Sequence, residues 1–119
     1  MSHDVIFESA RMNGEGVYDV SPEETLKKAS EVSIIDVRRP DEFTGELGHI
    51  EGAKLATLET NLLKTLETLP QDKTYVFVCR SGGRSLQAAA MAHTKGFTNV
   101  YNMSGGMMQW NRLGLPTQK

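Results

Sequence analysis

The chain has few of the features that would place it outside a reducing compartment. Among its 119 residues there is one cysteine, Cys79, which excludes an intramolecular disulfide and is typical of a protein kept reduced. Long apolar runs are also missing. No segment approaches the roughly 18 apolar residues of a membrane span, and the first residues lack the basic start and apolar core of an export signal. We therefore expect a cytoplasmic protein with no membrane partner.

Positive charge is not concentrated in the sequence. The net charge is −2 and there is no basic block, which argues against nucleic acid as a partner. The three histidines and the one cysteine show no metal-ligand spacing, so we expect no metal. Gly82-Gly83 lacks the Gly-Lys-Ser/Thr ending of a nucleotide phosphate-binding loop, and we expect no cofactor.

What is present predicts one α/β domain. The chain has 39% hydrophobic residues and a length at which folding buries roughly 65% of the unfolded surface. Short β-like runs alternate with helical patterns over residues 17–119, which predicts a layered fold with a mostly parallel central sheet flanked by helices. Residues 1–16 are expected to form an N-terminal arm or an edge strand around residues 5–7.

Local signals predict where the elements lie. A capping box at residues 21–24, with Pro22 at the first helical position, begins one helix, and Gly96 ends another. Leucines at positions 58, 62, 66 and 69 have helical spacing and predict core packing before Pro70. Strands are expected at residues 18–20, 33–37, 54–56, 74–78 and 99–102, and helical segments at residues 22–30, 41–44, 85–95 and 106–113.

Cys79 stands at the most informative point of the chain. It follows the apolar run 75–78 and precedes a turn that contains Gly82-Gly83 and two arginines, Arg80 and Arg84. A helix follows directly, so residues 80–85 supply unpaired backbone N–H groups that point toward any negative charge on the sulfur. The two glycines permit the tight backbone that such a loop needs.

This setting makes Cys79 a candidate nucleophile. A free cysteine has a pKa of about 8.5, and a helix N-terminus with nearby arginines can lower it to within about 3.5–7.5. Because nucleophilicity falls with the pKa, the larger contribution of the loop is to bind an anionic substrate and to stabilise a charged sulfur product. The alternative is that Cys79 packs as a small hydrophobe. The glycines and arginines within the next five positions favour the functional interpretation.

These residues resemble the rhodanese-like sulfurtransferases, whose active-site loop runs from a cysteine through four residues to a position often held by arginine. Cys79 to Arg84 fits that loop, and the resemblance spans about residues 18–117. Glu51 departs from the family, which commonly has proline there; this should affect only the local turn. Three further segments match in order: Ile35-Asp36-Val37-Arg38 followed by Glu42-Phe43; Gly48-His49-Ile50-Glu51-Gly52-Ala53; and Gly105-Gly106 with Trp110, Gly114 and Pro116.

The resemblance implies that sulfur from a small anionic donor such as thiosulfate forms a persulfide on Cys79. The acceptor must then be external, as cyanide, a small thiol or a cysteine of a partner protein, because the chain has no second cysteine. Cell-cycle dual-specificity phosphatases look similar in fold but have five residues between cysteine and arginine. The shorter loop fits one sulfur atom better than a tetrahedral phosphate. Phosphatase or arsenate-reductase-like chemistry on Cys79, and a non-catalytic binding module, are the alternatives.

Each loop residue has two interpretations. The guanidinium groups of Arg80 and Arg84 suit an oxyanion substrate, although most arginines are solvated surface charges. The hydroxyls of Ser81 and Ser85 either donate to the persulfide or cap the helix, and the sequence does not separate these roles.

Residues outside the loop are predicted to support it. Asp36, at the end of a buried strand, is expected to accept hydrogen bonds from loop backbone or from an arginine such as Arg38, rather than to act as an acid or base. His49 is expected to be structural within its turn rather than to polarise substrate. Trp110 is predicted to anchor the core and His93 to be exposed, while Met103, Met107 and Met108 either line the pocket or pack.

Overall fold

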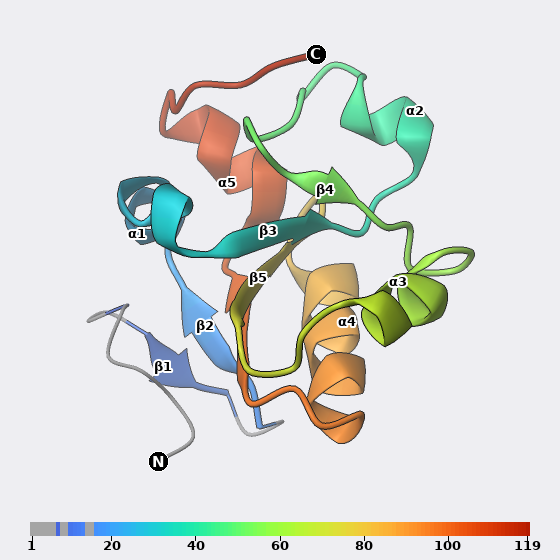
Figure 1. The fold of residues 1–119 in the computed structure, drawn as a ribbon. Helices are drawn as coiled ribbons and strands as arrows, with labels where there is room; N and C mark the ends of the chain where they lie inside the picture. Colours follow the sequence, from blue (N-terminus) through green and yellow to red (C-terminus); the bar gives the residue numbers. More distant parts are fainter. Residues whose placement is uncertain (1–6, 8–9, 14–15) are drawn as a thin grey trace.

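The computed structural model describes residues 7, 10–13 and 16–119, and these form one layered α/β unit (Figure 1). In this part of the chain the sheet has the strand order β1-β2-β6-β5-β3-β4. Each pair of neighbouring strands in the order β2-β6-β5-β3-β4 is parallel, while β1 pairs antiparallel with β2. The strands are β1 (Arg11–Met12), β2 (Tyr18–Val20), β3 (Ser33–Asp36), β4 (Lys54–Leu55), β5 (Thr74–Val78) and β6 (Asn99–Met103).

Helices cover both faces of the sheet (Figure 1). Buried side chains of α3 and α4 pack on one face, and those of α5 pack on the other, where α1 contacts α5. The predicted fold class is therefore confirmed. The helices are α1 (Pro22–Lys27), α2 (Pro40–Phe43), α3 (Leu62–Thr68), α4 (Gly83–Thr94) and α5 (Gly106–Arg112), with a 3-10 turn at Ala29–Glu31.

The central strand β5 is buried along its whole length. Tyr75, Phe77 and Cys79 belong to the core beneath α3 and α4, whereas Val76 and Val78 belong to the core on the α5 face. A strand that is covered on both faces needs apolar side chains at every position, which explains the continuous run that precedes Cys79. The strand therefore fixes the direction of the cysteine side chain toward α4.

Element boundaries differ from the predicted ones for local reasons. At the start of α1 the Ser21 hydroxyl accepts the Glu24 N–H at 3.1 Å, but the α-helix ends at Lys27 and the chain continues as the 3-10 turn. The leucine stripe is helical only from Leu62, and Leu58 reaches the same core from the preceding turn. Helix α4 begins two residues earlier than expected because Gly82 takes a left-handed conformation directly before it.

At the N-terminal end, a short edge strand lies at Arg11–Met12. The edge strand expected around residues 5–7 lies outside the described residues except for Phe7, which is buried against Tyr101 with ring centroids 4.8 Å apart. No helix in the described ranges is long and apolar enough to cross a membrane.

Helix α5 begins directly against the backbone that follows Cys79. Met107 N–H donates to the Cys79 carbonyl at 2.8 Å, and Met108 N–H donates to the Arg80 carbonyl at 2.9 Å. Gly106 has φ +58°, and a Cβ placed on it would lie 2.5 Å from both carbonyl oxygens. Only glycine allows this close approach.

Gly106→Ala should therefore destabilise the protein more than Gly114→Ala. Both glycines have positive φ, but no described atom lies within 4 Å of a Cβ built on Gly114. We expect about 1–2 kcal/mol for the left-handed alanine in each variant, and an additional overlap cost of about 1–3 kcal/mol for Gly106→Ala alone. Urea unfolding of both variants measures this difference, and equal losses of stability would contradict the tight contact.

Candidate functional site

Cys79 lies at the carboxyl end of β5, where the sheet meets the N-terminus of α4. Only 1% of the Cys79 surface is exposed. Ligands of open parallel sheets bind at this end of the strands. The predicted position of the cysteine relative to strand and helix is therefore what the structure shows.

Two donors of the loop point at the sulfur. Gly82 N–H donates to Cys79 Sγ at 3.0 Å, and Ser85 Oγ lies 3.3 Å from the same atom. Gly82 has φ +111°, a conformation that side-chain-bearing residues rarely adopt. The left-handed glycine thus turns the loop back so that its N–H faces the sulfur.

Opposing effects act on the pKa of Cys79. Burial raises it, because a charged sulfur is poorly solvated in the core. Hydrogen bonds from the Ser85 hydroxyl and from the N–H groups of Ser85, Gly82 and Ser81 lower it, and together they hold the pKa below its ordinary value. The hydrogen bonds therefore outweigh the effect of burial on the pKa of Cys79.

Arg84 is bound across the loop to α2. Its two terminal nitrogens donate to the two carboxylate oxygens of Glu42 at 2.8 and 2.9 Å. These hydrogen bonds lower the pKa of Glu42 to about 2. Arg84 thus ties the cysteine loop to α2, and direct contact of Arg84 with substrate stays a prediction.

Arg80 has a different environment. It is exposed, and no hydrogen bond or ion pair joins its guanidinium to another described residue. Together with Asp41, Glu46 and Leu47 it lines a pocket of about 190 Å³ beside α2. Ser81 and Gly83 are also exposed. This outer rim of the loop is the part that a solute can reach first.

The Asp36–Arg38 pair fixes the backbone next to the loop. Both residues are buried, and Asp36 accepts from the Arg38 backbone N–H, Nε and Nη2 at 3.2, 2.9 and 2.7 Å. Arg38 also donates to the carbonyls of Gly48 and Glu42. Asp36 therefore accepts from Arg38, one of the two partners expected for it. Through Arg38, the end of β3 is also bonded to the backbone at Glu42 and at Gly48.

His49 is held away from the sulfur by its own contacts. Its Nδ1 lies 2.8 Å from the Phe43 carbonyl oxygen, and the two rings stack with centroids 3.8 Å apart. Since a carbonyl only accepts, Nδ1 carries the proton. Backbone bonds pair His49 with Gln118. These contacts fit a structural role.

The large apolar candidates belong to the core. Trp110 is fully buried and its indole N–H donates to the Pro116 carbonyl at 2.9 Å. Met103 and Met107 are buried on the same face of the sheet, whereas Met108 is 38% exposed. His93 is exposed.

Two polar residues near the sulfur were missed from the sequence. Asn102, buried in β6, lies with its Oδ1 2.5 Å from Ser85 Oγ, and its Nδ2 donates to Asp19 in β2 at 3.1 Å. An asparagine in the interior of a strand is a signal that could have identified this position. Glu42, the partner of Arg84, was noted only as part of a motif, since no local pattern connects positions 42 residues apart.

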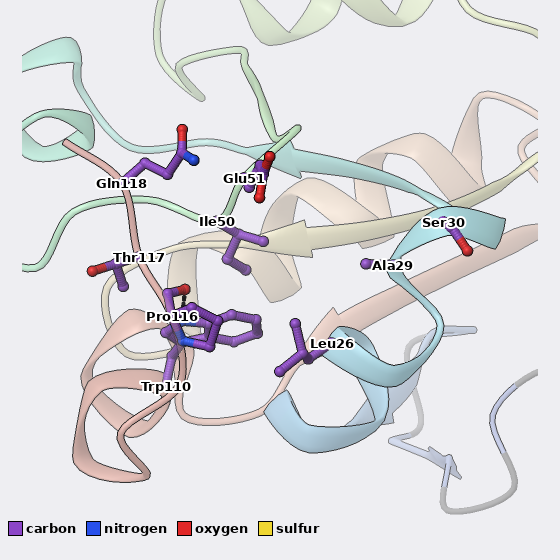
Figure 2. A pocket seen from close by; sticks show the side chains of 9 residues that line it. All are labelled: Leu26, Ala29, Ser30, Ile50, Glu51, Trp110, Pro116, Thr117 and Gln118. Atoms are coloured by element: carbon purple, nitrogen blue, oxygen red, sulfur yellow. Dashed lines mark hydrogen bonds between the residues drawn. The ribbon is translucent and has the colours of Figure 1, made fainter.

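A separate pocket of about 320 Å³ lies between α1, the turn at Ile50 and Glu51, and the C-terminal tail (Figure 2). Trp110, Pro116 and Leu26 form its apolar walls, and Glu51 lies at its edge (Figure 2). The departure from the family pattern at Glu51 therefore falls at this pocket and not in the cysteine loop.

Comparison with known proteins identifies the family. The rhodanese-like domain matches residues 21–113. A sulfurtransferase of Allochromatium vinosum is 35% identical over 76% of this chain and 82% of its own length. The chain belongs to the rhodanese-like family, and several of the relatives that it matches are named sulfurtransferases.

Two further relatives and one solved structure are similar to this chain over different shares of their own length. The probable adenylyltransferase/sulfurtransferase MoeZ of Mycobacterium tuberculosis is 35% identical over 76% of this chain, which spans only 23% of that relative. Thiosulfate sulfurtransferase GlpE of Vibrio cholerae is 27% identical over 84% of the chain and 92% of its own length. The crystal structure of a rhodanese-like domain protein from Staphylococcus aureus covers 85% of this chain and 98% of its own, with TM-score 0.71 and 29% identity.

Glu42→Gln should remove a pH-dependent part of the stability. The folded pKa of Glu42, about 2, lies below the ordinary 4.5, so the Arg84 pair stabilises the protein fully above pH 4.5 and loses this effect as the pH falls toward 2. We expect the wild type to exceed Glu42→Gln by about 1 kcal/mol at pH 7 and the difference to shrink across that range.

Asp41→Asn is the matched control for this comparison, because Asp41 pairs with Arg39 at an exposed position. It should change stability little at any pH. Urea unfolding between pH 3 and 7 measures all three proteins. A constant difference between wild type and Glu42→Gln would contradict the ionised pair.

Proposed function

We propose that this protein is a thiosulfate sulfurtransferase of the rhodanese type that carries sulfane sulfur on Cys79. The observation that carries the proposal is the buried sulfur of Cys79 with the Gly82 N–H at 3.0 Å and the Ser85 hydroxyl at 3.3 Å. A backbone donor such as the Gly82 N–H, which is oriented before the reaction, stabilises an anion with little reorganisation. The thiosulfate-specific name of the Vibrio cholerae relative supports this choice of donor.

In the first half-reaction, the Cys79 thiolate attacks the outer sulfur of thiosulfate. A new S–S bond forms, the original S–S bond breaks, and its electron pair leaves with sulfite. The terminal sulfur then carries the negative charge, within reach of the loop N–H groups. No proton moves in this step, because the thiolate form of Cys79 is the species that attacks.

In the second half-reaction, an external nucleophile attacks the terminal sulfur. With cyanide, a C–S bond forms, the persulfide S–S bond breaks, and Cys79 returns to the thiolate as thiocyanate leaves. A small thiol or a cysteine of a partner protein takes the same role. Since the chain has no second cysteine, the acceptor comes from outside. The cytoplasmic location and the absence of nucleic-acid and membrane partners stay predictions from the sequence.

Arg80 is the residue that we propose for attracting the donor. Its guanidinium is exposed next to the cysteine, and a guanidinium binds an oxyanion through two parallel hydrogen bonds. Arg84 contributes mainly by holding the loop against α2, since Glu42 already occupies two of its donors.

Wild-type protein incubated briefly with thiosulfate should gain the mass of one sulfur atom, while Cys79→Ser gains none. Adding cyanide should remove the extra mass and release thiocyanate. Intact-protein mass spectrometry with a thiocyanate assay measures both steps. Sulfur added to both proteins, or to neither, would count against the proposal. Hydrolysis of a phosphate ester that depends on Cys79 would favour the phosphatase alternative.

Arg80→Ala should raise the KM for thiosulfate by about tenfold or more, because a hydrogen bond to a charged group contributes about 1.5–3 kcal/mol and each 1.4 kcal/mol is about tenfold. The matched control is Arg112→Ala, which removes an exposed arginine at the far end of α5. Steady-state kinetics in low salt measure the effect. An unchanged KM in Arg80→Ala, or an equal rise in the control, would show that Arg80 does not bind the donor.

A further inference from the structure

A buried amide lies behind the reactive sulfur. Asn102 is 5% exposed in the middle of the sheet. It contacts Ser85 through Oδ1 at 2.5 Å and Asp19 through Nδ2 at 3.1 Å. A row of polar side chains therefore runs from Cys79 through Ser85 and Asn102 to Asp19. Burying polar side chains in an apolar core is costly unless they are paired, and here each one has a partner.

The Ser85 hydroxyl lies between competing acceptors. Its oxygen is 2.5 Å from Asn102 Oδ1, 3.3 Å from Cys79 Sγ and 3.3 Å from the Gly82 carbonyl oxygen. A hydroxyl carries one proton and can donate to only one strong acceptor at a time. Asn102 Oδ1 is the nearest of the three acceptors, and an amide oxygen can only accept, so we assign the hydroxyl proton of Ser85 to this contact.

Asp19 fixes which end of the amide faces Ser85. The amide NH2 of Asn102 donates to Asp19 Oδ1, because a carboxylate oxygen accepts hydrogen bonds. The amide oxygen is then left to face the hydroxyl. A flipped amide would direct its oxygen at a carboxylate and is therefore disfavoured.

We propose that Asn102, oriented by Asp19, is a positioning residue that holds the Ser85 proton while Cys79 is neutral and yields it when the sulfur becomes an anion. While the Ser85 hydroxyl donates to Asn102 Oδ1, the Ser85 oxygen is free to accept the S–H of the neutral thiol. Once the sulfur is charged, it becomes the stronger acceptor and the hydroxyl rotates toward it. A role of this switch in turnover rests on the proposed sulfur transfer. The exchange of the hydrogen bond itself is independent of that function.

The two residues should therefore act on the Cys79 pKa in opposite directions. Removing the hydroxyl takes a donor away from the thiolate, so the pKa rises. Removing the amide oxygen leaves the hydroxyl to donate to the sulfur without competition from Asn102, so the pKa falls. The charged groups around the loop, Arg80, Arg84 with Glu42, and the Asp36–Arg38 pair, are the same in both variants.

The test is a pH titration of thiolate absorbance near 240 nm on the full chain. Because Cys79 is the only cysteine, the signal reports one group once the tyrosine contribution is subtracted with Cys79→Ser. The variants are Ser85→Ala, Asn102→Val and the double variant. At a fixed pH below the wild-type pKa, we expect the thiolate-to-thiol ratio to fall about threefold or more in Ser85→Ala and to rise about threefold or more in Asn102→Val, corresponding to pKa changes of about 0.5.

The double variant separates this switch from a general loss of packing. If Asn102 acts through the hydroxyl, the double variant should have the pKa of Ser85→Ala alone. A shift of the same sign in both single variants, or an Asn102→Val shift that persists without the hydroxyl, would overturn the proposal.

Asp19→Asn replaces Asn102→Val if that variant does not fold. It lets the Asn102 amide flip and should lower the Cys79 pKa. Removing a negative charge also lowers it, so the same change is measured in the Ser85→Ala background, where only the charge effect remains. Equal shifts in the two backgrounds would overturn the proposal. If the shifts appear but thiosulfate adds no sulfur to Cys79, the proposed function fails and the switch stands.

Discussion

Burial of the Cys79 sulfur among fixed hydrogen-bond donors is the constraint on which this structure depends. Taking a sulfur anion out of water is unfavourable, and the loop offsets this with the N–H of Gly82 and the hydroxyl of Ser85. The left-handed conformation of Gly82 turns its own N–H toward the sulfur. The pKa of Cys79 lies below its ordinary value as the outcome of these opposing effects.

Elements distant in sequence hold that loop in place. Helix α5 donates two backbone N–H groups to the carbonyls of Cys79 and Arg80, and Gly106 makes the approach possible. On the other side, Glu42 of α2 binds Arg84. The loop is thus fixed between two helices, which keeps its donors oriented before any substrate arrives and lowers the cost of reorganisation during the reaction.

Short-range signals predicted most of the fold and the cysteine loop. The apolar run before Cys79 is buried on both faces, and Gly82 does provide the turn, because both features depend on neighbours in the chain. The partners Glu42, Asn102 and Asp19 depend on pairing between strands and helices far apart in sequence, and a single sequence contains no record of it. For the same reason, the sequence did not reveal the Glu42 carboxylate that faces Arg84.

The most direct test of the central claim is an amide NMR comparison of the thiol and persulfide forms. If the loop stabilises an anionic sulfur, the N–H resonances of Gly82, Ser81 and Ser85 should move downfield when the persulfide forms and return after cyanide. The same treatment of Cys79→Ser should leave them in place. Resonances of these three residues that stay unchanged while sulfur is bound to Cys79 would contradict the account, because the charge would then be stabilised elsewhere.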